Sequence, residues 1–170
     1  ALQVVATTTQ VADLARTIAG DRADVVQLLQ PGTDAHEYEP TSSDLAAIAD
    51  ADLVLANGAG LDTWIDKLHD SSGSTARIVQ TTQGIAIRRG TDGPDPHVWM
   101  DPTLAAQMVA TIGEALAAAD TRNAQGYRDR ASSLRATLGE LDRELASQIA
   151  QVPPSRRTIV TDHDAFGYFT

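Results

Sequence analysis

Short apolar runs alternate with amphipathic stretches along the first part of the chain. Runs rich in β-branched residues, which are typical of buried strands, occupy residues 2–5, 25–29, 53–55, 78–79 and, much later, 159–160. Between the first four runs, apolar residues recur at spacings of three and four, which predicts helices. Strand alternating with helix predicts right-handed βαβ units, and therefore an α/β lobe with a parallel sheet and flanking helices.

Three helices are expected between these strands, each with one apolar face. The residues on these faces are Val11, Leu14, Ala15 and Ile18 in the first helix, Leu45, Ile48 and Ala49 in the second, and Leu61, Trp64, Ile65 and Leu68 in the third. The first is followed by Gly20 at the position of a helix C-cap, and the second is preceded by Thr41-Ser-Ser-Asp44, which resembles a capping box.

The pattern changes after Ile87. Residues 88–96 are rich in Gly, Pro and Asp, which predicts a loop. Asp101 followed by Pro102 is typical of an N-cap and first helical position, and predicts a helix to about residue 119. A longer apolar stripe covers residues 122–151, which as one helix would measure about 45 Å at 1.5 Å per residue.

A helix of that length is too long for a crossover beside a four-stranded sheet, so we interpret it as a strut between two lobes. The predicted parts are an N-terminal α/β lobe (1–120), a long connecting helix (121–152) and the beginning of a C-terminal α/β lobe (155–170). The single strand expected at 158–161 could not bury both of its faces. We therefore expect the rest of the second lobe to be absent here, or a domain-swapped second copy to complete it.

Composition narrows the class of protein. The chain has 170 residues, of which 42% are hydrophobic, but no apolar run approaches the roughly 18 residues of a membrane span. A net charge of −10 argues against a nucleic-acid partner. The chain has no cysteine, which excludes disulfides, thiolate metal sites and cysteine nucleophiles. No leader peptide is recognised, so the chain is expected to be cytoplasmic or already processed.

Three histidines stand beside acidic residues in turn-like segments. His36 follows the second expected strand, His163 follows the last one, and His97 precedes the helix at Asp101. Ligands of open α/β sheets bind beyond the carboxyl ends of the strands, and imidazole is the commonest metal ligand. The three rings could therefore share one ion. Each alone also fits an ordinary turn residue, and His69 fits a helix C-terminus favoured by the helix dipole, so it is excluded.

Three segments, residues 31–40, 95–102 and 160–169, together resemble the zinc- and manganese-binding receptors of bacterial ABC importers, in that family's order. The resemblance implies two lobes joined by a long helix, with one ion held between them by His36, His97 and His163. It also implies an extracytoplasmic protein, periplasmic or anchored as a lipoprotein, that delivers metal to a permease and is not an enzyme. An adhesin or a zinc chaperone on the same fold would share these features.

The choice of metal rests on how the chain differs from that family. The family's fourth ligand, a carboxylate late in the second lobe, has no counterpart here, and the histidine-rich loop of many zinc members is missing before His97. Many manganese members carry glutamate at the third position, where this chain has His163. Three imidazoles favour Zn²⁺, and Mn²⁺ remains the alternative. Since ligating imidazoles must be neutral, affinity is expected to fall as the pH drops through about 6.5.

A zinc-dependent hydrolase is the alternative from another class, with Glu37 as the base that activates a metal-bound water. The chain has no His-Glu-x-x-His, Gly-x-Ser-x-Gly or phosphate-loop motif to support it. A plain α/β domain with incidental histidines would bind no stoichiometric metal. If the metal site exists, Asp101 or Asp164 is expected to orient a ligating imidazole by accepting its second N–H.

Overall fold

Four parallel strands form the central sheet. The structure, a computed structural model, describes residues 1–91 and 93–169. The sheet has the order β2-β1-β3-β4, in which the strands are β1 (Leu2–Ala6), β2 (Ala23–Gln27), β3 (Leu53–Ala56) and β4 (Arg77–Gln80). Because the order reverses on the two sides of β1, the carboxyl ends of β1, β2 and β3 face a common crevice. The prediction of a parallel α/β lobe is confirmed.

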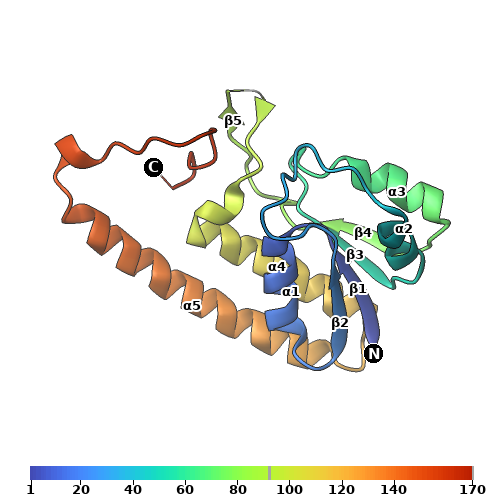
Figure 1. The fold of residues 1–170 in the computed structure, drawn as a ribbon. Helices are drawn as coiled ribbons and strands as arrows, with labels where there is room; N and C mark the ends of the chain where they lie inside the picture. The colour runs from blue at the N-terminus through green and yellow to red at the C-terminus, as the bar shows by residue number, and fades with distance from the viewer. Residues whose placement is uncertain (92, 170) are drawn as a thin grey trace.

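Helices cover both faces of this sheet (Figure 1), and they are α1 (Thr9–Ala19), α2 (Ser42–Ala49), α3 (Trp64–Ser72) and α4 (Pro102–Ala119). Alternate strand residues point into two separate cores, as the pleat requires. Val4 and Leu55 pack with α1 and α4 on one face. Val5 and Val54 pack with α2 and α3 on the other. The strands therefore read as continuous apolar runs, because both of their faces are buried.

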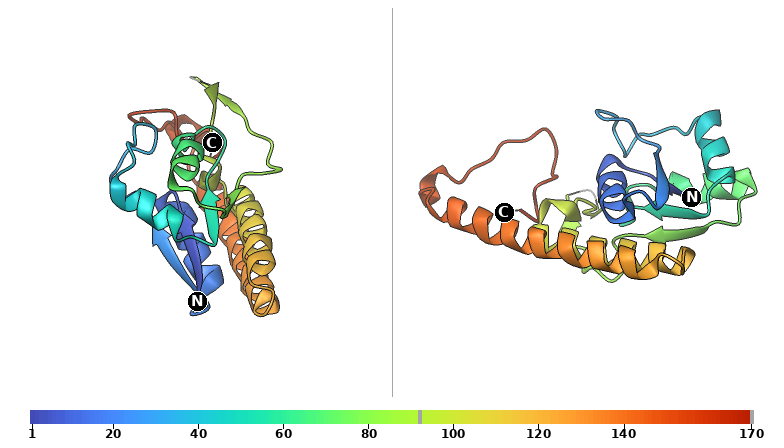
Figure 2. Two further views of the ribbon diagram at one scale, coloured as in Figure 1. Left: turned by 90° about the vertical axis from the view of Figure 1, so that its right-hand side faces the viewer. Right: turned by 90° about the horizontal axis from the view of Figure 1, so that it is seen from below.

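The longest helix, α5 (Ala124–Ala150), lies beside α4 and extends well beyond the sheet (Figure 2). Its 27 residues span about 40 Å. Its first half packs on the core, where Tyr127 and Ala131 are buried and Leu134 and Leu138 are partly buried. Beyond a short 3₁₀ turn, η2 (Pro154–Arg156), the chain folds back toward the lobe (Figures 1 and 2). None of the described helices has both the length and the apolar character that a membrane span needs.

The strand expected at 158–161 is wrong. Every residue of this stretch is described, and its backbone forms no strand pairing. Ile159 is 52% exposed and Val160 is 93% exposed. The β-branched residues favour an extended backbone, but a strand also needs a neighbour, and the β1–β4 sheet lies across the molecule from this segment (Figure 1). The described part of the expected second lobe is thus an irregular segment.

Smaller differences concern the ends of elements. The loop expected at 88–96 contains a minimal antiparallel hairpin, β5 (Arg89–Gly90) with β6 (Gly93–Pro94), and a 3₁₀ turn, η1 (Val98–Met100), leads from it to α4. The third helix begins at Trp64, after Leu61, which is buried in the preceding turn. Asp92, within the expected loop, and Thr170, at the end of the expected second lobe, lie outside the described residues.

Candidate metal centre

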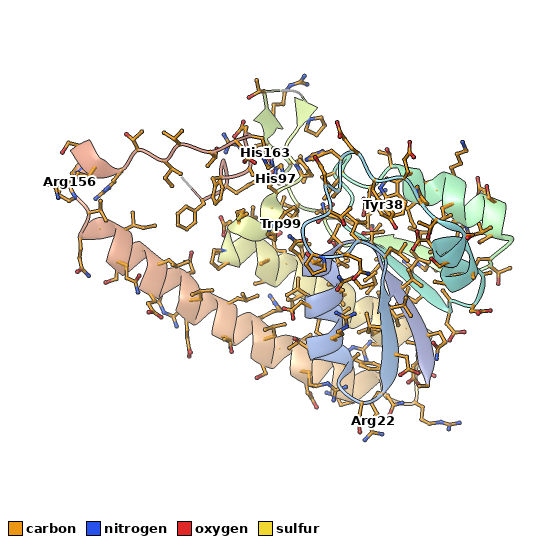
Figure 3. The ribbon with its side chains drawn as sticks, in the orientation of Figure 1. Arg22, Tyr38, His97, Trp99, Arg156 and His163 are labelled. Atoms are coloured by element: carbon orange, nitrogen blue, oxygen red, sulfur yellow. The ribbon has the colours of Figure 1, made fainter. Side chains whose placement is uncertain are left out.

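The three histidines singled out from the sequence meet at one cleft. Their ring centroids lie 5.6 Å apart for His36 and His97, 5.3 Å for His97 and His163, and 6.2 Å for His36 and His163. Each ring offers one nitrogen within 4.8 Å of the other two. The cleft has a volume of about 860 Å³ and lies between the carboxyl ends of the strands, the hairpin and the returning C-terminal segment, where Figure 3 labels His97 and His163.

The His36 loop is fixed by its neighbours. Asp34 Oδ1 accepts a hydrogen bond from the His36 N–H at 2.8 Å, in an Asx-type turn. Farther along, the Tyr38 ring packs on Trp64 of α3 with centroids 4.9 Å apart, and its hydroxyl donates to Asp44 at 2.7 Å. Asp44 belongs to the capping box of α2. The ring of His36 itself remains exposed to the cleft.

His97 is the most rigidly held of the three. It is 6% exposed, and Asp95 Oδ1 accepts hydrogen bonds from both its main-chain N–H (3.0 Å) and its Nδ1 (2.8 Å). Because a carboxylate can only accept, Nδ1 carries a proton, and in the neutral imidazole Nε2 then has the free lone pair. An acid that holds the far nitrogen of an imidazole is the usual companion of a histidine metal ligand. The second oxygen, Asp95 Oδ2, is buried and has no hydrogen-bond partner among the described residues.

A buried network of polar groups also holds the His97 loop in place. The Asn57 side-chain amide donates to the carbonyl oxygen of Pro96 at 3.3 Å. Asn57 is itself fixed by Asp62, which is 2% exposed and accepts from the main-chain N–H groups of Asn57 (2.6 Å) and Gly58 (2.9 Å). These bonds join the carboxyl end of β3 to the loop that carries His97.

His163 is held more loosely. Its Nδ1 lies 3.1 Å from Asp162 Oδ1, in a pair whose side chains are 56% and 95% exposed. The hydrogen bond from His163, followed by its charge, lowers the pKa of Asp162. The structure does not support the two acids expected to orient an imidazole. Asp101 instead caps α4, and Asp164 accepts from Thr91 at 3.3 Å. Asp95, which sequence reasoning passed over inside its own motif, takes that role.

This donor set suits a borderline transition-metal ion. Nitrogens bound to Zn²⁺ at 2.0–2.1 Å in a tetrahedron lie roughly 3.4 Å apart. The present spacing of up to 4.8 Å thus requires side-chain shifts of roughly 1 Å, which the two exposed rings can make. Thiolates are absent because the chain has no cysteine. Glu37, the base that the hydrolase alternative needs, is not among the residues that line the cleft.

Comparison with known proteins agrees with this geometry. Residues 4–170 match the family model described as zinc-uptake complex component A, periplasmic. The chain belongs to this family. It is 34% identical to the iron-binding protein YfeA of Yersinia pestis over 98% of its own length and 55% of that protein. It is 31% identical to the manganese-binding lipoprotein MntA of Halalkalibacterium halodurans, over 99% of the chain and 56% of the relative.

Solved structures that are similar to this chain are also metal-binding proteins. Zn(II)-bound AdcA from Streptococcus pneumoniae superposes with a TM-score of 0.88 at 30% identity, over 99% of this chain and 36% of that one. A Cd-bound periplasmic metal-binding protein from candidatus liberibacter asiaticus also gives 0.88, at 31% identity, over 98% of this chain and 64% of that one. The chain thus spans about half the length of the curated relatives it matches. These relatives are binding proteins, which agrees with the prediction that the chain is not an enzyme.

Proposed function

We propose that this protein is an extracytoplasmic receptor that binds one divalent metal ion as cargo and delivers it to the permease of an ABC importer. The observation that carries the proposal is the convergence of His36, His97 and His163 within 4.8 Å of one another. Two of these rings come from the sheet lobe and the third comes from the segment after α5. An ion at this place joins two parts of the chain, as a cargo site between lobes requires.

The partner and location follow from the relatives' names. Relatives of this chain include a manganese ABC transporter substrate-binding lipoprotein, PsaA, from Streptococcus mitis. Together with the periplasmic family description, that name supports an ABC importer permease as the partner and a site of action outside the cytoplasmic membrane. Domain-swapped self-association stays a prediction, supported by the exposed side chains of Ile159 and Val160.

Zinc is the proposed cargo, and manganese is the alternative. Three neutral imidazoles are borderline ligands that favour Zn²⁺ over Mn²⁺ both by ligand type and by the general order of divalent affinities. Relatives and similar structures are named for iron, manganese, zinc and cadmium, so their names support a divalent metal without choosing among these ions. The argument for zinc therefore rests on the ligands.

Elemental analysis of the purified full-length protein is the test. We expect one equivalent of zinc, and tighter binding of Zn²⁺ than of Mn²⁺ in competition titrations with a metal indicator. His97→Ala should abolish stoichiometric binding. His69→Ala is the matched control, because His69 Nε2 is bonded to the Ala76 carbonyl oxygen at 2.8 Å and lies outside the cleft. Absence of stoichiometric metal in the wild type, or equal retention by both variants, contradicts the proposal.

A further inference from the structure

The hydroxyl of Tyr168 lies between two backbone groups at the base of the β5–β6 hairpin. It accepts a hydrogen bond from the Arg88 main-chain N–H at 3.0 Å and donates one to the Asp95 carbonyl oxygen at 2.7 Å. Tyr168 belongs to the C-terminal segment that carries His163, whereas Arg88 and Asp95 belong to the sheet lobe. The phenol thus links two parts of the chain that are joined in sequence only through α4 and α5.

This hydroxyl takes the place of a missing ladder bond. In a hydrogen-bonded antiparallel pair, two opposite residues exchange both N–H to C=O bonds. Arg88 and Asp95 make one of them directly, from Asp95 N–H to the Arg88 carbonyl at 2.9 Å. The second bond is relayed, from Arg88 N–H to the Tyr168 hydroxyl and from that hydroxyl to the Asp95 carbonyl. The hairpin base is therefore completed by a side chain of the other segment.

Neighbouring groups pack closely around the Tyr168 phenol. The Arg88 guanidinium carbon lies 5.6 Å from the centre of the Tyr168 ring, within the range of a cation–π interaction. Ala165, between His163 and Tyr168, is 5% exposed. Gly167 leaves no space beside the hairpin, because a Cβ there would lie 3.0 Å from Asp95 Oδ2 and closer still to the Arg88 guanidinium. The segment therefore lies directly against the side chains of Arg88 and Asp95.

We propose that Tyr168 is a positioning residue that fastens the His163 segment to the His97 loop and thereby slows release of the metal. Asp95 is the common element, since its carbonyl binds the phenol while its carboxylate holds His97. While the phenol is engaged, His163 stays near His97 even when its own bond to the ion breaks, so that the effective concentration of the imidazole for rebinding stays high. This role in release rests on the proposed function, whereas the hydrogen-bond relay does not.

Tyr168→Phe in the full-length protein tests the release step. Tyr127→Phe is the matched control, because it also removes a phenol hydroxyl, one that donates to Asp120 at 3.0 Å at the α4–α5 junction. We expect Zn²⁺ transfer to excess chelator, followed by stopped flow, to be roughly tenfold faster in Tyr168→Phe, because the substitution removes both hydrogen bonds of the hydroxyl. The control should release at the wild-type rate. The absorption spectrum of bound Co²⁺ should change only in Tyr168→Phe.

A second measurement needs no metal. In the metal-free protein, Tyr168→Phe should speed hydrogen exchange of the Arg88 amide relative to wild type, and Tyr127→Phe should not. Unchanged exchange at Arg88 overturns the relay, and release at the wild-type rate overturns the role in metal retention. If the wild type binds no metal at all, the proposed function fails instead, and the exchange experiment still decides the relay.

Discussion

Two histidine–aspartate contacts in the cleft differ mainly in their surroundings. Asp95 holds His97 with both side chains under 9% exposed, whereas Asp162 holds His163 with both more than half exposed. A buried charge-assisted hydrogen bond contributes far more than an exposed one, which solvent and salt screen. The buried contact therefore fixes the direction of its imidazole, and the exposed contact leaves the second ring free to adjust to an ion.

Asp95→Asn is expected to weaken Zn²⁺ binding by roughly 10- to 100-fold, the usual effect of losing an acid behind a ligating imidazole. The amide is neutral and accepts the Nδ1–H bond less strongly, so His97 becomes a poorer and less directed ligand. Competition titration with a chromophoric chelator measures the change. Asp162→Asn is the comparison and should reduce affinity only slightly. Equal losses in the two variants would show that burial does not control these contacts.

Sequence reasoning found His36 because it lies in a turn after a strand, and His97 because it lies just before a helix. It found His163 through the resemblance of its segment to a known family, since the strand expected before it does not form. It did not find Asp95 or Tyr168. Asp95 is separated from His97 by a single proline, so its role depends on the local bend of the chain. The Tyr168 contact depends on where the chain returns after α5, which no local pattern encodes.

Among the elements, the α4–α5 pair depends on one close approach. A Cβ at Gly113 would lie 2.7 Å from Ala131 Cβ, too near for either backbone to accept without movement. Gly139, also within α5, has no neighbour within 4 Å of such a Cβ. Alanine at either position should favour the helix equally, but only at Gly113 would the added Cβ clash with a neighbour. Comparing the two positions therefore separates the effect of helix propensity from the effect of packing.

Gly113→Ala should destabilise the protein by about 1–3 kcal/mol through overpacking, despite the better helix propensity of alanine. Gly139→Ala should leave stability unchanged or raise it by up to about 1 kcal/mol, because only the propensity term changes. Urea unfolding followed by circular dichroism gives both values. A stabilised Gly113→Ala variant would mean that α5 can move away from α4 at little cost.

The turn between α4 and α5 should make stability depend on pH. The side-chain hydrogen bond from Asn123, at 2.6 Å, lowers the pKa of Asp120, and the bond from the Tyr127 hydroxyl lowers it further. A carboxyl with a lowered folded-state pKa stabilises the fold above its unfolded value of about 3.9, and this contribution is lost as the pH falls through the lowered value.

Asp120→Asn should accordingly be less stable than wild type at pH 6, with the difference shrinking as the pH falls below about 4. Chemical unfolding of both proteins at a series of pH values measures it. Parallel stability curves across the whole acid range would show that the carboxylate of Asp120 makes no net contribution.

The helices could be predicted from the sequence because the spacing of apolar residues is a local property. Both ends of α5, for example, lie close to the expected 122–151. The strand at 158–161 was misread because strand pairing is not local. Residues such as Ile159 and Val160 indicate an extended backbone, but pairing depends on a neighbour elsewhere in the chain.

At the scale of the whole molecule, the metal site brings together the sheet lobe and the segment that follows α5. The helix spans about 40 Å and packs on the core of the lobe through its first half, as far as Leu138, so the His163 segment reaches the cleft by folding back along it. A helix continuous from Ala124 to Ala150 contains no break at which the segment could swing as a rigid body. Metal loss should therefore change local order around His163 more than overall dimensions.

Small-angle X-ray scattering should give the same radius of gyration for metal-free and zinc-loaded full-length protein. Hydrogen exchange, in contrast, should show protection of residues 157–169 on zinc binding, with little change in β1–β4, because the segment that carries His163 is held most loosely before the ion binds. His163→Ala should abolish that protection while leaving the sheet unaffected. A clear contraction on zinc binding would place the motion in α5 or its ends, and would mean that the metal closes the molecule as a hinge instead of ordering one segment.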